Sequence, residues 1–227
     1  MTLLNADFSR RAVVHADSEP WIPSPMPGVD RRPLDRIGDE VARATTVVRY
    51  APGSAFSPHV HGGGEEFLVL EGVFQDEHGD YPAGSYVRNP PTSSHTPASA
   101  PGCTILVKLW QFDPDDRTWV RIAPGEVAFE PRAPGAVSAL LHRDAFEEVR
   151  LERWDPGARI ALSPRDGVEI FVLGGGFREA GETFGRWSWL RLPKGARLDA
   201  EAGPDGAAVW MKTGHLARAP KGPGRDD

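Results

Sequence analysis

The sequence contains one cysteine, Cys103, and no long apolar run. A single cysteine excludes a disulfide within the chain, so the fold depends on its core instead. No stretch approaches the ~20 consecutive apolar residues that a membrane-spanning helix needs, and no apolar run follows the first basic residues. We therefore expect a cytoplasmic protein.

Excess positive charge is also lacking. The chain has 26 Lys and Arg against 32 Asp and Glu, which gives a formal net charge of -6. Proteins that bind nucleic acids or membrane surfaces neutralise phosphates with basic residues. We therefore expect no nucleic-acid and no membrane partner. A small-molecule ligand or substrate fits this balance better.

Turn-forming residues, in contrast, are abundant: 25 Gly and 22 Pro are spread over 227 residues. Between them lie short β-rich runs at 45–50, 66–70, 86–88 and 104–112. Two weak helical candidates, 32–43 and 144–148, show no apolar stripe, and we interpret them as loops or edge strands. Short strands separated by turns predict an all-β sandwich or small barrel.

An internal repeat indicates two copies of one β domain. Residues 49–53 recur as 153–157, residues 66–74 recur as 169–177, and Arg88 with Pro90 recurs as Arg191 with Pro193. Matching blocks in one order, at an offset of 103 or 104, indicate duplication. We expect an N-terminal arm plus first domain over 1–125, a second domain over 126–217, and a disordered tail over 218–227.

His59 and His61 are the strongest candidates for chemistry. Two histidines two apart on a strand project from one face. Glycines 62–64 allow a sharp turn after them, so that Glu65, the first residue of the next strand, can reach the same site. Glu66 is the rival carboxylate, but its parity predicts that it faces away.

His95 is the fourth candidate, because Pro90 and Pro91 force a turn just before it. Imidazole plus carboxylate is a ligand set for divalent iron, zinc, manganese, nickel or cobalt. We therefore predict one divalent metal ion per chain, with iron and zinc first. The alternative is a polar barrel mouth whose groups hydrogen-bond one another.

The spacing Gly53-x5-His59-x-His61-x3-Glu65-x6-Gly72, followed by Gly84-x5-Pro90-x4-His95, resembles the two motifs of the cupin superfamily. The second motif departs from the family pattern at residues 91–94. The run 59–77 with the later Gly-x-Tyr-x-Arg-x-Pro run is similar to the cupin domain of the ChrR family. The resemblance implies two double-stranded β-helix jelly-roll barrels, a bicupin, with zinc or iron held by His59, His61, Glu65 and His95.

The resemblance leaves two functions open. ChrR anti-sigma factors carry a helical His-x3-Cys-x2-Cys domain ahead of the cupin, which this chain lacks. Some relatives are iron-dependent dioxygenases that cleave diketones or hydroxyketones, and we favour that activity. The alternative is a zinc-binding sensor or interaction module without catalysis. No catalytic side chain is assigned.

The second copy differs at the ligand positions. The counterparts of the three histidines fall on residues such as Leu162, Pro164 and Leu198, so we expect a metal-free scaffold domain. Its aromatic residues are expected in the core, with a homodimer contact as the alternative. In the first copy, Phe67, Val69 and Trp110 are candidates to line the pocket beside the metal, and core packing is the alternative for each.

Overall fold

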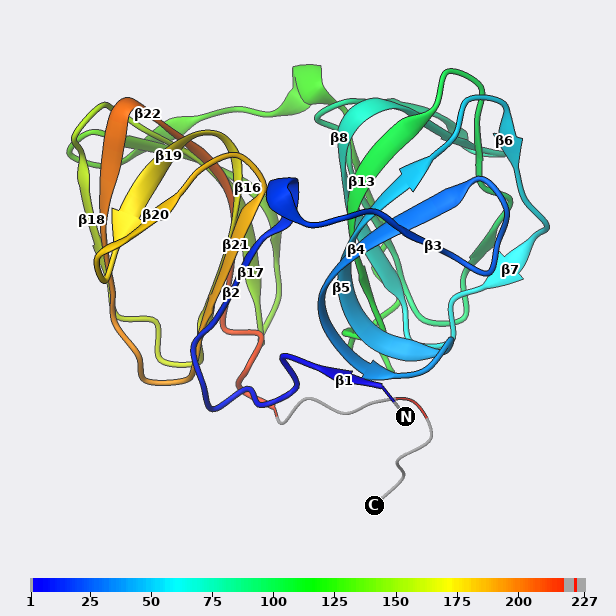
Figure 1. Ribbon diagram of the computed structural model, residues 1–227, viewed down its shortest axis with the longest axis horizontal. Coiled ribbons are helices and arrows are strands. Elements are labelled where there is room, and N and C mark those ends of the chain that lie inside the picture. Colours follow the sequence, from blue (N-terminus) through cyan, green and yellow to red (C-terminus); the bar gives the residue numbers. More distant parts are fainter. Residues whose placement is uncertain (1, 219–222, 224–227) are drawn as a thin grey trace. The chain divides into compact units, whose positions relative to one another are not determined.

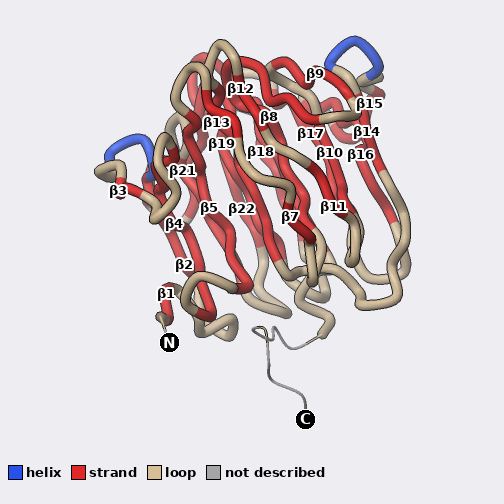
Figure 2. Tube along the Cα trace, turned by 90° about the vertical axis from the view of Figure 1, so that its right-hand side faces the viewer, coloured by secondary structure: helices blue, strands red, loops and turns tan. Residues whose placement is uncertain are grey.

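The computed structural model describes residues 2–218 and 223, and their regular secondary structure consists of β-strands and two short 3-10 helices (Figures 1 and 2). The expected all-β class is confirmed. Most of the predicted disordered tail, 218–227, lies outside the described residues. Among the residues described, no helix is long and apolar enough to cross a membrane.

Two compact units make up the chain. Among the described residues, the first contains 2–6, 20–126 and 223, and the second contains 7–19 and 127–218. The sequence analysis assigns residues 7–19 to the first domain, whereas the structure assigns them to the second. The reason is β2 (Ala12–His15), which pairs antiparallel with β21 (Ser188–Leu192).

The first unit has one main antiparallel sheet in the order β1-β4-β5-β13-β8-β10-β14. Short strands β3, β6, β9 and β12 attach to it, and β7 pairs with β11 separately. The strands are β1 (Leu3–Leu4), β3 (Ile22–Pro23), β4 (Val29–Gly38), β5 (Ala42–Tyr50), β6 (Ser54–Ala55), β7 (His59–Val60), β8 (Glu65–Asp76), β9 (Gly79–Pro82), β10 (Tyr86–Asn89), β11 (Ser94–His95), β12 (Ala98–Ser99), β13 (Cys103–Leu109) and β14 (Val120–Ile122), followed by the 3-10 turn η2 (Pro124–Glu126).

The second unit has the order β15-β16-β17-β22-β19-β21-β2, with β18 beside β22 and β20 beside β19. Its remaining elements are η1 (Ala16–Ser18), β15 (Glu130–Ala133), β16 (Ala136–Arg143), β17 (Glu148–Trp154), β18 (Arg159–Leu162), β19 (Val168–Glu179), β20 (Glu182–Phe184) and β22 (Leu198–Thr213). Strand β2 therefore occupies, beside β21, the place that β14 occupies beside β10 in the first unit.

Two local features differ from the expected strands. The run 104–112 ends as a strand at Leu109, because Trp110 adopts a left-handed backbone conformation with φ 58°. The weak helical candidate 32–43 belongs largely to β4, whose pairing with β5 shifts register between Pro33 and Asp35. A bulge is where a strand tolerates proline, since proline cannot donate to the ladder.

The first unit's sheet has two different faces. One carries an apolar cluster that includes Phe67, Val69, Phe74 and Ile105. The other carries buried charged and polar groups: Arg88 donates to Glu66 at 3.0 Å, and Lys108 donates to Thr45 at 2.8 Å. Adjacent residues alternate between these faces, which explains how Glu65 and Glu66 enter different environments.

The second unit repeats this arrangement. Glu169 is the cross-strand partner of Arg191 and Lys212, as Glu66 is of Arg88 and Lys108 in the first unit. The opposite face carries an apolar cluster that contains Val168, Ile170 and Val172. The duplication seen in the sequence is therefore a duplication of strand pairing.

Candidate metal centre

Three histidines meet in the first unit. Strands β7 and β11 pair so that His59 and His95 are direct cross-strand partners. His61 follows β7, and its ring centroid lies 4.9 Å from that of His59 and 4.6 Å from that of His95. One ring nitrogen from each of the three lies within 4.8 Å of the others. His61 and His95 are buried, whereas His59 is exposed, so the cluster is open on one side.

The three glycines after His61 are required by two aromatic rings. A Cβ on Gly63 would lie 2.4 Å from Cδ2 of Trp110, and one on Gly64 would lie 2.5 Å from Cδ2 of Phe112. Gly64 also has φ +77°, and its carbonyl accepts a hydrogen bond from the Trp110 amide at 3.1 Å. The rings therefore pack flat against the backbone that joins His61 to Glu65, and no other residue type fits there.

Glu65 is the carboxylate beside the imidazoles. Its Oε2 lies 3.5 Å from Nε2 of His61 and 3.6 Å from Nε2 of His95. Glu66 lies on the other face of β8, in the ion pair with Arg88. The structure thus brings together the four residues predicted from the motif spacing and places the rival carboxylate elsewhere.

Two further residues, which the sequence analysis missed, orient these groups. Asn89 donates from Nδ2 to Oε2 of Glu65 at 3.1 Å, and Oδ2 of Asp76 lies 3.3 Å from Nδ1 of His95. Asp76 also accepts from the His78 amide at 2.8 Å. Both contacts depend on the tertiary structure: Asn89 ends a strand whose register places it opposite Glu65, and Asp76 ends the strand that Glu65 begins.

The pKa values of the two buried imidazoles, His61 and His95, are shifted in opposite directions. Burial lowers the pKa of His61, although the Glu65 charge partly opposes this. Burial would also lower the pKa of His95, but the hydrogen bond with Asp76 and the charges of Glu65 and Asp76 outweigh it, so that pKa is raised. The pKa of Asp76 is lowered in return: burial would raise it, but the bonds from His95 and the His78 amide prevail.

The donor atoms fit a divalent cation. Nε2 of His61 and Nε2 of His95 are buried, and neither has a hydrogen-bond partner within the described chain. A buried polar atom without a partner is costly, and its lone pair is available to a cation. Three imidazoles and one carboxylate, with no thiolate, form a ligand set for iron, zinc, manganese, nickel or cobalt.

The proposed pocket-lining residues occupy two environments. Phe67 and Val69 share the face of Glu65 and are each 1% exposed within the apolar cluster. The Phe67 ring lies 4.6 Å from that of Phe74, which in turn lies 5.7 Å from the His95 ring. Trp110 is half-buried and covers the glycine loop.

The second unit has apolar side chains at the positions that correspond to the candidate metal ligands. Val168 occupies the strand position of Glu65, and its cross-strand partner Leu192 that of Asn89. Both are in the core with Leu198, which the sequence analysis aligned with His95. The pairing aligns Glu169 with Glu66 and not with Glu65, in agreement with the repeat of residues 66–74 at 169–177.

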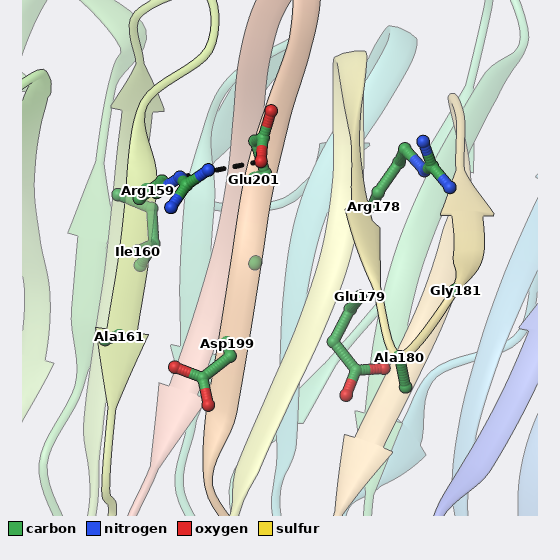
Figure 3. A pocket seen from close by; sticks show the side chains of 10 residues that line it. Arg159, Ile160, Ala161, Arg178, Glu179, Ala180, Gly181, Asp199 and Glu201 are labelled. Carbon is green, nitrogen blue, oxygen red and sulfur yellow. Dashed lines mark ion pairs between the residues drawn. The ribbon is translucent and has the colours of Figure 1, made fainter.

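The second unit has two other polar features, a side-chain cluster and a surface groove. His142, Asp144 and Glu147 cluster near one hairpin, but both Glu147 oxygens accept from Lys212 at 3.1 Å, and Oδ1 of Asp144 accepts from two backbone amides. A groove of about 450 Å³ lies on strands β18, β22 and β19 (Figure 3). There Arg159 and Glu201, both exposed, form an ion pair at 3.6 Å.

Comparison with known proteins identifies the fold and one domain. Residues 9–113 match the family model described as the ChrR cupin-like domain. The structure is similar to that of a Nostoc punctiforme protein provisionally described as a dioxygenase: TM-score 0.76, 13% identity, covering 96% of this chain and 88% of the other.

Two Escherichia coli structures are also similar. YlbA gives a TM-score of 0.69 at 13% identity, covering 95% of each chain. The pirin YhhW in complex with nickel(II) gives 0.63 at 14% identity, covering 90% of this chain and 99% of the other. No curated protein sequence matches the chain. The expected cupin fold and the resemblance to ChrR cupins are confirmed.

Proposed function

We propose that this protein, whose residues 9–113 match the ChrR cupin-like domain family, holds one divalent metal ion through His59, His61, Glu65 and His95. We further propose that it is a non-haem metal-dependent dioxygenase acting on a small diketone or hydroxyketone. The observation that carries the proposal is the pair of buried, unpartnered Nε2 atoms of His61 and His95, both beside Oε2 of Glu65.

The surrounding residues have defined tasks in such a site. Asp76 holds the proton of His95 on Nδ1, which leaves Nε2 free to bind, and Asn89 holds Glu65 in place. Phe74 packs against His95 and keeps water away from its buried side. The metal would supply a redox-active centre with open positions for a chelating substrate. The exposed side at His59 is the route of access.

The relatives support a metal-dependent activity without specifying it. One structural neighbour is a nickel(II) complex and another carries a provisional description as a dioxygenase. Iron or zinc is the first expectation for the ion, with manganese, nickel and cobalt as alternatives. Few acids or bases are needed beyond the ligands, because the metal supplies most of the chemistry.

The alternative function is a zinc-binding sensor or interaction module. The observation that favours it is the dense packing behind the imidazoles, where Phe67, Val69 and Phe74 are each 1% exposed. In that case the ion would stabilise the fold by holding the strands together, and the exposed side of the site would bind a partner or a signal molecule.

Metal analysis followed by oxygen-uptake measurements tests these proposals. Purified protein should contain about one metal ion per chain, and His61→Ala should lose it, whereas the control His15→Ala in the second unit should keep it. Iron-reconstituted protein should then consume oxygen with a member of a panel of β-diketones and aromatic hydroxyketones. Full metal content in His61→Ala would refute the site, and full iron occupancy without oxygen uptake would favour the alternative function.

A further inference from the structure

Two arginines of β4 share the face of the candidate metal centre. Cross-strand partners lie on the same side of a sheet. The register therefore aligns one row of residues across strands β4, β5, β13, β8 and β10: Arg36, Ala44, Leu109, Glu65 and Asn89. Arg36 thus stands in the row of Glu65, three strands away.

Arg31 occupies a second row on the same face. Its partners across the sheet are Val48, Ile105 and Val69, all members of the apolar cluster on the Glu65 side. The bulge between Pro33 and Asp35 adds one residue between the two arginines, and so keeps both on this face.

Arg36 and Arg31 are distinct from the buried charged network on the other face. That network follows the neighbouring row, in which Asp35 accepts from the Thr45 amide at 2.9 Å and Lys108 donates to Thr45. Asp35 immediately precedes Arg36, so their side chains leave opposite sides of β4. The two arginines are therefore not explained by that network.

Arg36 and Arg31 make only weak interactions within the described part of the chain. Arg36 donates to the carbonyl oxygens of Gly38 and Glu40, which carry no net charge. Nη1 of Arg31 lies 3.6 Å from a carboxylate oxygen of Glu40, whose side chain is 65% exposed. An exposed ion pair at this separation is readily exchanged. Burial is the main cause that lowers the pKa of Arg36, and the charge of Arg31 adds to it, while the charges of Glu40 and Asp39 oppose it.

Resting on the proposed function, we infer that the ligand of the metal centre carries a carboxylate, which Arg31 and Arg36 bind while its oxo or hydroxy oxygen faces the metal. Guanidinium groups bind carboxylates through paired charge-assisted hydrogen bonds. Three strand spacings, about 14 Å along the sheet, separate the Arg36 and Glu65 backbones. Arg36 and Glu65 lie on the same face of the sheet, with Ala44 and Leu109 between them in the row, so the two side chains and the ligand together would bridge this distance.

The test uses two probes of similar size and shape. The full-length protein is loaded with Co²⁺, its metal content is measured, and the visible spectrum is titrated with pyruvate or with pyruvamide, in which a neutral amide replaces the carboxylate. A metal ion alone favours an anion, so the arginine variants decide the question. We expect Arg36→Gln and Arg31→Gln each to weaken pyruvate binding about tenfold or more, and to change pyruvamide binding less than twofold.

Two further variants control for charge and fold. Arg49→Gln removes a cation on the opposite face of the same sheet, where Arg49 pairs with Asp30, and should leave pyruvate binding unchanged. Arg36→Lys keeps the charge and should retain part of the affinity. Metal-loaded Arg36→Gln and Arg31→Gln that bind pyruvate as tightly as the unmodified protein would overturn the carboxylate inference and leave the metal proposal standing. A chain that takes up no Co²⁺ would overturn both.

Discussion

The Oδ2 atom of Asp76 lies 3.3 Å from Nδ1 of His95, while Nε2 of the same ring lies 3.6 Å from Oε2 of Glu65. The imidazole is therefore held between two carboxylates, with its two nitrogens in different roles. The side chain of Asp76 is fully buried, so it orients the ring in an environment where water competes little. This relationship makes Asp76 a positioning residue for the candidate metal centre.

We expect Asp76→Asn to weaken metal binding about 10- to 100-fold, because outer-shell partners of ligating histidines have effects of this size. Competition with a chelator of known affinity measures the change. Asp80→Asn, in the same hairpin but exposed, is the matched control. Equal affinities for Asp76→Asn and the control would show that the Asp76–His95 contact does not orient a ligand.

Metal affinity should fall as the pH decreases through the titration of the histidines, because protonated imidazoles cannot ligate. The raised pKa of His95 means that this ring takes up a proton first, so the loss should begin above the ordinary value of 6.5. His61, whose pKa is lowered, follows at lower pH. Apparent dissociation constants for Zn²⁺ measured from pH 5.5 to 8.5 give the profile. An affinity that stays constant across this range would contradict imidazole ligation.

Gly63→Ala should lower thermal stability and metal content together. The added methyl group would meet the Trp110 ring at 2.4 Å, and overpacking of this kind costs about 1 to 3 kcal/mol. The double variant Gly63→Ala with Trp110→Ala should regain metal content, since the clash is gone. Gly125→Ala, where nothing lies within 4 Å, is the control. A single Gly63→Ala variant with normal melting and normal metal content would show that the ring can move aside freely.

Removing residues 2–19 should loosen β21 in the second unit, because β2 is its cross-strand partner there. Hydrogen exchange followed by mass spectrometry should show faster exchange for Ser188–Leu192. Exchange in β10 of the first unit, which pairs with β8 and β14, should change little. Unchanged protection of β21 would mean that β2 contributes nothing to holding that strand.

The sequence alone was sufficient for the fold class, the duplication and the site candidates, because each depends on local spacing. Strand alternation separates Glu65 from Glu66, and two-residue spacing keeps His59 and His61 together. The absence of histidines at the ligand positions of the second copy indicates that it does not bind a metal ion in the way proposed for the first. All of these features can be recognised from the spacing of residues along the chain, without knowing which distant strands pair.

Tertiary structure decided what depends on pairing between distant strands. The contact of Asp76 with His95, the register that puts Arg36 in the row of Glu65, and the pairing of β2 with β21 have no local signature. Trp110 illustrates the limit: the sequence extends its strand to residue 112, but packing on the glycine loop ends that strand at Leu109. Motif spacing thus determined which residues gather at the site, whereas sheet register and packing determined which residues orient them and what else shares their face.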